Sequence, residues 1–413
     1  MIGLLWLLAC QPDVAWIGDA GYASVQAAID RADDDALIEV APGVYVEALR
    51  VDHPLTLQGL HGGVTLSGGG TARVVDATAP VTLLDLNLEA GFAERGAALR
   101  ATSGVHLERV AVRGCRGLSL VEVTGELFAS ELTIDADHPG DALVASLGDA
   151  DLRATTVRAA AGAGLLLDGG ALQLTDVSVT EAPMGSALRG DSIAAQRLSV
   201  AGDLTLSSPD LAATDVRAGL LYASGAGELS QLTVSAVVSD GVDLRDVIVR
   251  GSSFALVRAT AVGAVVLASD RPIELALADA TLRNALLLDV DDGALAPTAL
   301  HTGGDVVLEH LTWVGGHHDA LATGGSVRLD QSVLASLRLR RVGPVTSAWS
   351  YAWGDGLPAW SRRPWEVVAP QLDGVELSAD SALWGLGPDG EPGAFGGVDG
   401  AVSRAAWERA QAD

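Results

Sequence analysis

The sequence predicts an all-β protein: a single-stranded parallel β-helix of about 12–15 coils with a short N-terminal capping helix. Three observations predict this class. An eight-residue apolar pattern recurs along the chain, 49 glycines are spread over 413 residues, and aromatic residues make up only 4%. A core of Val, Leu, Ile and Ala interrupted by glycine turns suits many short strands better than a helical bundle.

The charge balance excludes one class of partner. The chain carries 53 acidic and 26 basic residues, a formal charge of -27, and all of its basic residues are arginine. A nucleic-acid-binding protein needs a basic surface that faces the phosphates. We therefore expect no nucleic-acid partner, whereas 49% apolar residues are enough to build a folded core.

The first ten residues are an apolar run that ends in Leu7-Leu8-Ala9-Cys10. This run resembles the lipobox of bacterial lipoprotein signal peptides, which implies cleavage before Cys10, lipidation of its thiol and anchoring in a membrane. Residues 1–9 are then the signal peptide and 10–21 a short tether, with an outer-membrane or cell-surface location. A buried N-terminal strand and a plain secretory signal are the alternatives.

The second cysteine, Cys115, has no intrachain partner if Cys10 is lipidated, so the fold has to hold without a disulfide. We predict that Cys115 is a small core or turn residue.

Residues 22–345 are predicted to form the β-helix domain, including its cap. The recurring pattern is apolar, any, apolar, any, any, apolar, any, apolar, which describes two short strands joined by one extra residue. Its copies start at Val81, Val105, Leu127, Ala150, Leu172, Ile193, Leu211, Gly227, Val242, Ile273, Val306 and Val327. The mean step of about 22 residues leaves room for a third short strand in each coil. The steps to Ile273 and to Val306 are longer than the others, and the Ile273 copy is degenerate.

Stacked coils place equal positions of the pattern above one another. We predict that the fifth position points outward and forms a column in which Asp85, Arg109 and Glu131 alternate in charge. A leucine-rich repeat is the main structural alternative, but it needs a helical half in each repeat and usually an asparagine ladder. The chain has only two asparagines, too few to form such a ladder.

The segment before the repeats predicts the cap. Ser24 is a suitable N-cap for a short helix, and Val25, Ala28, Ile29 and Ala32 fall on one helical face. The following strands contain Ala41-Pro42-Gly43-Val44-Tyr45 and Pro54-Leu55-Thr56-Leu57.

Residues 22–76, in this order and spacing, closely resemble the N-terminal region of the right-handed parallel β-helix, or pectin-lyase-like, superfamily. That superfamily contains lyases, hydrolases, epimerases, adhesins and proteins without known activity, so the resemblance implies a fold and does not settle a function.

The catalytic patterns of this superfamily are incomplete in the chain. A polygalacturonase-like site needs paired aspartates, Gly-His-Gly and Arg-Ile-Lys; the nearest string is Gly316-His317-His318, and lysine is absent. Asp289, Asp291 and Asp292 could bind calcium as in a pectate-lyase-like site, or they form an acidic surface loop. We expect no other cofactor.

Residues 346–413 are predicted to form a Trp- and Gly-rich C-terminal capping segment. Arginine and aromatic side chains gather at and just before its start, as they do where proteins hold sugar rings and their acidic substituents. The candidate glycan-binding residues are Arg338, Arg340, Arg341, Trp349, Tyr351, Trp353, Trp360, Arg362, Arg363 and Trp365. The alternative is that the tryptophans pack over the last coil as a cap.

These observations predict a monomeric, lipid-anchored envelope protein that serves as a structural or glycan-recognition module without enzymatic activity. Its expected partners are a membrane and a polysaccharide. The alternative is a lyase or hydrolase that acts on an anionic polysaccharide, with its site between Asp289 and Asp319.

Overall fold

The structure is a computed structural model that describes residues 13–159, 161–267, 273–288, 299–322, 325–330, 332–341, 345–348, 351–353, 372–373, 376–377 and 400–412. Strands make up most of the chain and form a parallel β-solenoid of about 12 turns, which confirms the predicted all-β parallel β-helix. The chain divides into unit 1 (residues 1–191 and 199–202) and unit 2 (residues 192–198 and 203–413). Each unit is described separately.

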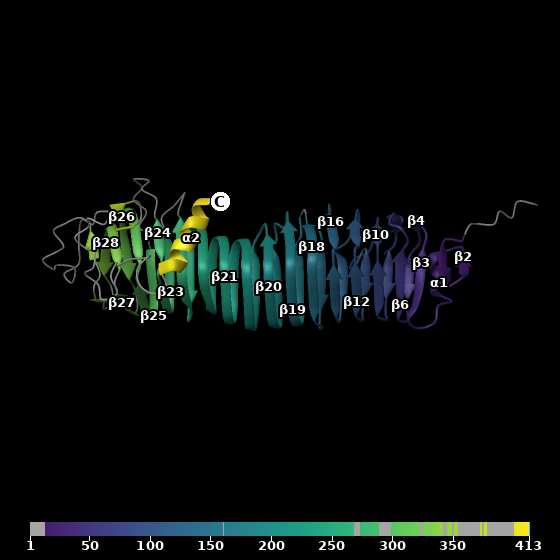
Figure 1. Cartoon of the computed structure of the whole chain (residues 1–413), viewed down its shortest axis with the longest axis horizontal. Coiled ribbons are helices and arrows are strands. Elements are labelled where there is room, and N and C mark those ends of the chain that lie inside the picture. Colours follow the sequence, from purple (N-terminus) through teal and green to yellow (C-terminus); the bar gives the residue numbers. More distant parts are fainter. Residues whose placement is uncertain are drawn as a thin grey trace, which may run out of the picture. The chain divides into compact units, whose positions relative to one another are not determined.

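Unit 1 consists of three parallel ladders, because each coil contributes one strand to each ladder (Figure 1). Ladder 1 contains β3 (Ala36–Val40), β6 (Leu55–Gly59), β9 (Val81–Leu84), β12 (Val105–Glu108) and β15 (Leu127–Ser130). Ladder 2 contains β4 (Gly43–Val46), β7 (Val64–Ser67), β10 (Leu86–Glu89), β13 (Ala111–Arg113) and β16 (Thr133–Ala136). Ladder 3 contains β5 (Leu49–Val51), β8 (Val75–Ala77), β11 (Leu99–Ala101), β14 (Ser119–Thr124) and β17 (Asp141–Ser146).

Longer strands continue these ladders. β18 (Ala150–Ala159) extends ladders 1 and 2, and β19 (Leu165–Thr180) pairs with both β17 and β18. Before the first coil, the antiparallel hairpin of β1 (Ala15–Ile17) and β2 (Ala20–Tyr22) pairs with β3.

The predicted helix is present as α1 (Val25–Ile29). The Ser24 hydroxyl accepts a hydrogen bond from the Ala27 N–H at 3.1 Å, which is the geometry of an N-cap. Val25, Ala28 and Ile29 are buried, as the sequence predicts, and the helix contacts β1, β2, β3 and β5.

β20 (Ser186–Val200) contains residues of both units, and unit 2 consists of the same kind of parallel coil. Its strands are β21 (Leu204–Val257), β22 (Thr260–Leu267), β23 (Glu274–Arg283), β24 (Leu286–Leu288), β25 (Ala299–Glu309), β26 (Thr312–Ala322), β27 (Gly325–Asp330), β28 (Val333–Arg341), β29 (Val345–Ala348) and β30 (Tyr351–Trp353). The short strands β31 (Leu372–Asp373) and β32 (Glu376–Leu377) form a separate antiparallel pair.

The fifth position of the repeat turns the chain from one strand to the next. In unit 1 this residue has a positive φ in five successive copies, although none of the five is glycine. The residues are Asp85 (φ 57), Arg109 (φ 52), Glu131 (φ 53), Ala154 (φ 45) and Asp176 (φ 56). The flanking residues pair in register, so these corners stack in a column, and their side chains are at least partly exposed, as predicted.

In unit 2 the predicted register of the repeat around Ile273 is wrong. A copy starting at Ile273 would place Leu277 at the corner, but the left-handed residues are Asp279 and Asn284. Parallel pairing aligns Asp246, Gly263, Asn284 and His310 as successive corners. Two copies that the sequence reading missed therefore start at Ala259 and Ala280, and the two unusually long steps disappear. Asn284 and His310 are buried, unlike the corners of unit 1.

The C-terminal helix α2 (Gly400–Ala412) packs along the side of unit 2, where it contacts β21 and β22 (Figure 1). Ala406 and Ala410 lie in one buried cluster with Ile248, Val265 and Leu286. These last three residues occupy the seventh, outward position of their copies, where the copies of unit 1 carry residues such as Thr133, Thr156 and Ser178. An outward apolar residue needs a cover, and α2 supplies it.

Polar contacts fix α2 at its last turn. The Arg409 guanidinium binds the Asp246 carboxylate and donates a 3.0 Å hydrogen bond to the Asp246 carbonyl. Arg250 donates to the Ala410 carbonyl at 2.7 Å. Within the described residues, neither helix is long and apolar enough to cross a membrane.

Ala154→Gly tests the cost of the left-handed corner. An L-residue with this backbone pays about 1–2 kcal/mol, and glycine loses about 0.5–1 kcal/mol in chain entropy, so we expect a net stabilisation of about 0.5 kcal/mol. Ala111→Gly is the matched control, because Ala111 lies within β13 without a positive φ and should be destabilised by about 0.5–1 kcal/mol. Urea unfolding measures both, and equal effects of the two substitutions would contradict the strain argument.

The ion pair between Arg109 and Asp85 in the corner column depends on pH. Arg109 binds Asp85 at 2.6 Å and 3.0 Å, and this hydrogen bonding lowers the pKa of the Asp85 carboxyl group. A carboxyl group with a lowered folded-state pKa stabilises the fold above its unfolded pKa of about 3.9, and the effect disappears as the pH falls through the folded-state pKa.

Arg109→Gln should therefore lower the urea midpoint at pH 7, and the difference from the parent protein should shrink on acidification. The control is Arg100→Gln, which removes an exposed arginine with no ion pair among the described contacts. A difference that persists in acid would show that Arg109 acts through its packing and not through the carboxylate.

Candidate functional site

The structure describes only part of the predicted glycan-binding set. Arg338, Arg340 and Arg341 lie in β28, and Tyr351 and Trp353 lie in β30. The two strands pair in parallel, with Val333 opposite Tyr351 and Ala335 opposite Trp353. The remaining members of the set lie outside the described residues: Trp349, Trp360, Arg362, Arg363 and Trp365. Binding by this set stays a prediction.

The predicted lipidation and calcium residues also lie outside the described part of the chain. They are Cys10, Asp289, Asp291 and Asp292. Among the residues that the structure does describe, no group of three or more His, Cys, Asp or Glu side chains has a metal-binding arrangement.

Cys115 is a core residue, as predicted. It is fully buried, and its Sγ accepts a hydrogen bond from the Gly91 N–H at 3.2 Å. Burial raises the pKa of the thiol to about 11, so the group is protonated and unreactive near neutral pH.

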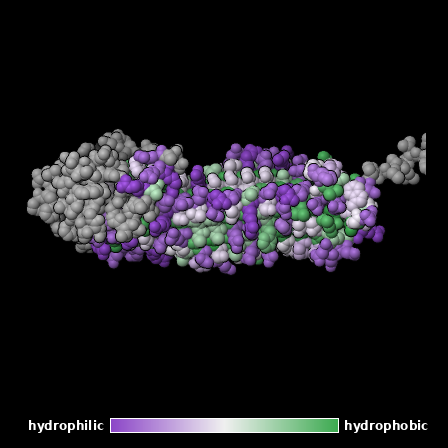
Figure 2. Space-filling model, viewed as in Figure 1, coloured by the Kyte–Doolittle hydropathy of each residue, from purple (hydrophilic) through white to green (hydrophobic). Residues whose placement is uncertain are grey.

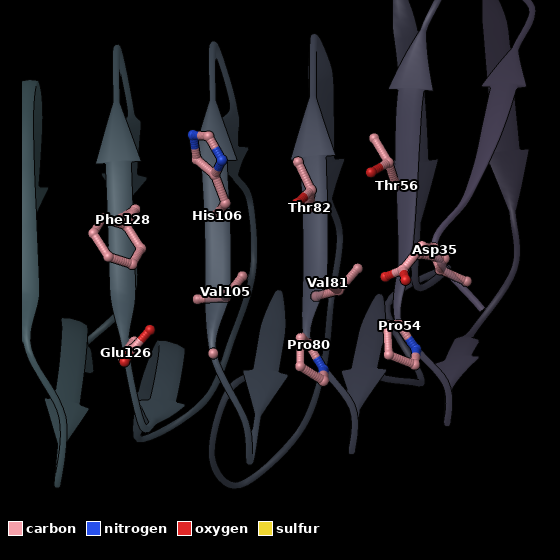
Figure 3. A pocket seen from close by; sticks show the side chains of 12 residues that line it. Asp35, Pro54, Thr56, Pro80, Val81, Thr82, Val105, His106, Glu126 and Phe128 are labelled. Atoms are coloured by element: carbon pink, nitrogen blue, oxygen red, sulfur yellow. The ribbon is translucent and has the colours of Figure 1, made fainter.

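A shallow groove of about 240 Å³ lies on the outer surface of ladder 1 in unit 1. It crosses β6, β9, β12 and β15, so its long direction follows the stacking of the coils (Figure 3). The buried residues Leu55, Val81 and Val105 lie beneath it and fix the strands against the core.

Two columns of outward residues form the groove. The first contains the residue before each strand: Asp35, Pro54, Pro80, Gly104 and Glu126. The second contains the second residue of each strand: Thr56, Thr82, His106 and Phe128. Figure 3 shows the second column as a row of side chains across the neighbouring strands.

The columns differ in chemistry along their length. The two prolines have no N–H and present apolar ring surface, while Gly104 has no side chain and leaves space beside Glu126. In the second column, two threonine hydroxyls are followed by an imidazole and an aromatic ring. Over unit 1, Figure 2 shows apolar surface in green between hydrophilic residues in purple.

Phe128 is the dominant apolar feature of the groove, and it is 45% exposed. His106 packs against it edge to face, with ring centroids 6.5 Å apart and an interplanar angle of 71°. This geometry favours one orientation of the ring while leaving part of its surface open to solvent. An exposed aromatic ring held by a neighbour is a suitable platform for the apolar face of a sugar.

The carboxylate groups of the groove stand at its two ends. Asp35 is the left-handed residue before β3, with φ 61, and Glu126 precedes β15. No arginine is among the lining residues. The groove can therefore accept hydrogen bonds from hydroxyl or ammonium groups, and it disfavours a ligand that carries carboxylates.

Sequence reasoning missed this groove because it followed the fifth position of the repeat and the tryptophan-rich segment. The available signal was the second position, where Thr82, His106 and Phe128 occur in successive copies. Reading that position down the stack would have placed a histidine next to an exposed phenylalanine.

Comparison of the chain with known proteins finds no match among protein-family profiles, curated proteins or solved structures.

Proposed function

We propose that the chain is a lipid-anchored envelope protein whose solenoid binds a glycan chain through the groove on ladder 1 without cleaving it. The observation that carries this proposal is the exposed ring of Phe128, oriented by His106 at one end of a groove that also presents threonine hydroxyls. Sugars combine apolar ring faces with many hydroxyl groups, and this surface offers partners for both.

The shape of the groove supports recognition of an extended ligand. Its two columns run across four stacked strands, so a chain lying along the solenoid would meet the same two positions in each coil. The spacing between neighbouring coils is about 4.8 Å, which sets a regular series of contact points. A polymer of repeated units suits such a surface better than a compact small molecule.

The charges of the groove weigh against the alternative of a lyase or hydrolase that acts on an anionic polysaccharide. Asp35 and Glu126 would face the carboxylates of such a substrate, and the whole chain has a charge of -27. The segment that contains Arg338 and Trp365 stays a proposed second contact region for the glycan. Right-handed winding of the coils is also part of the proposal, and it rests on the resemblance of residues 22–76 to the right-handed parallel β-helix superfamily.

The membrane anchor is the part of the proposal that rests on the resemblance of residues 7–10 to a lipobox. If it is correct, Cys10→Ser should move the expressed protein from the membrane fraction to the soluble fraction, because the thiol carries the lipid. Cys115→Ser is the control, since it removes the buried cysteine and should leave the protein in the membrane fraction. A Cys10→Ser protein that stays in the membrane fraction would contradict lipid anchoring.

Glycan binding is tested by Phe128→Ala. Loss of the ring platform should weaken binding to the best ligand of a glycan array about ten-fold, and Phe128→Tyr should retain most of the affinity because it keeps the ring. Phe92→Ala is the matched control, since Phe92 is 55% exposed in the same unit but does not line the groove. Titration calorimetry measures the affinities.

Equal affinities of the Phe128→Ala and Phe92→Ala variants would remove the groove from the proposal. A chain that binds no glycan on the array would contradict the proposed function as a whole.

A further inference from the structure

We infer that the ligand of the groove is a cationic glycan, a chain of amino sugars with free ammonium groups; this inference rests on the proposed glycan-binding function. The groove contains carboxylates near both ends and no arginine among its lining residues. A sugar chain with several positive charges would meet both carboxylates, and its hydroxyl groups would meet the hydroxyls of Thr56 and Thr82 between them.

The two carboxylates of the groove differ from several other acids of the same unit. In those cases an arginine neutralises the carboxylate: Arg109 binds Asp85, Arg153 binds Asp151 and Arg158 binds Asp135. Asp35 and Glu126 have no ion pair among the described contacts. They are therefore available to an external cation without displacing an internal one.

The register fixes how far apart the two charges lie. Asp35 and Glu126 occupy the same column, and successive pairing of β3, β6, β9, β12 and β15 places them four strands apart. At about 4.8 Å for each strand, the separation is about 19 Å. A ligand that meets both groups has to be extended and has to carry charge at more than one place, as a polymer of amino sugars does.

The geometry also indicates the orientation of contacts within the groove. Phe128 stands beside Glu126, two residues further along the chain, so a ring that stacks on Phe128 brings its substituents towards that carboxylate. At the other end, Asp35 lies beside Pro54 and Thr56 (Figure 3). One sugar unit can therefore use an apolar face and an ammonium group at the same time.

The experiment compares four probes by titration calorimetry: a glucosamine oligomer, an N-acetylglucosamine oligomer and a galacturonate oligomer of equal length, and an oligolysine peptide. We expect the glucosamine oligomer to bind most tightly, with an affinity that falls as salt is added, because exposed ion pairs are screened. The acetylated oligomer should bind more weakly, and the galacturonate oligomer should not bind.

Two isosteric variants assign the effect to the groove. Asp35→Asn keeps a residue type that tolerates the left-handed backbone, and Glu126→Gln keeps the shape of the side chain. Each should weaken binding of the glucosamine oligomer roughly two- to five-fold, the range that one exposed ion pair supplies. Glu94→Gln is the control: it changes the net charge equally at an exposed residue outside the groove and should leave the affinity unchanged.

The outcomes separate this inference from the proposed function. If the acetylated and free amino oligomers bind equally, while Phe128→Ala still weakens both, the charge preference is wrong and glycan binding stands. Tightest binding of the galacturonate oligomer would overturn the inference in the same way. If oligolysine binds as well as the glucosamine oligomer, or if none of the three oligomers binds, the inference is wrong. The proposed function is then decided separately by the glycan array and the Phe128→Ala variant.

Discussion

The left-handed residue at the corner of five successive coils of unit 1 is the constraint on which the rest of the structure depends. A single residue with a φ between 45° and 57° turns the chain from ladder 1 to ladder 2, and it recurs at Asp85, Arg109, Glu131, Ala154 and Asp176 in unit 1. L-residues rarely adopt this backbone, and its cost is met because the flanking strands are paired on both sides. The corner sets the register, and the register places every later side chain inward or outward.

Regular stacking makes the surface a set of columns. Each outward residue lies about 4.8 Å from the residue at the same repeat position in the next coil. The charge or shape at each position is therefore repeated or balanced along the stack. The ion pair of Asp85 and Arg109 is one result, and the row formed by Thr82, His106 and Phe128 is another. The groove is the gap between two such columns, and it needs no inserted loop or separate domain.

Some outward positions of the solenoid carry large apolar residues in place of polar ones. At the seventh position, Ile248, Val265 and Leu286 are apolar on an outer surface, and α2 covers them while Arg409 binds Asp246. In ladder 1, Phe128 is equally apolar and outward, but no part of the described chain covers it fully. In unit 2 the apolar residues are covered by α2 of the same chain. In ladder 1 the exposed Phe128 is the surface for which we propose an external ligand.

The sequence by itself determined the fold class, the helix that begins after Ser24, the burial of Cys115 and the stacked corners of unit 1, because these follow from local periodicity and from residue type. It misplaced the repeat around Ile273, since short apolar runs fit the pattern in more than one register and only strand pairing chooses between them. Only the tertiary structure determined the groove and the surface on which α2 packs. Asp35 and Glu126 lie far apart in the chain, and only the stacking of successive coils brings such distant residues into one column.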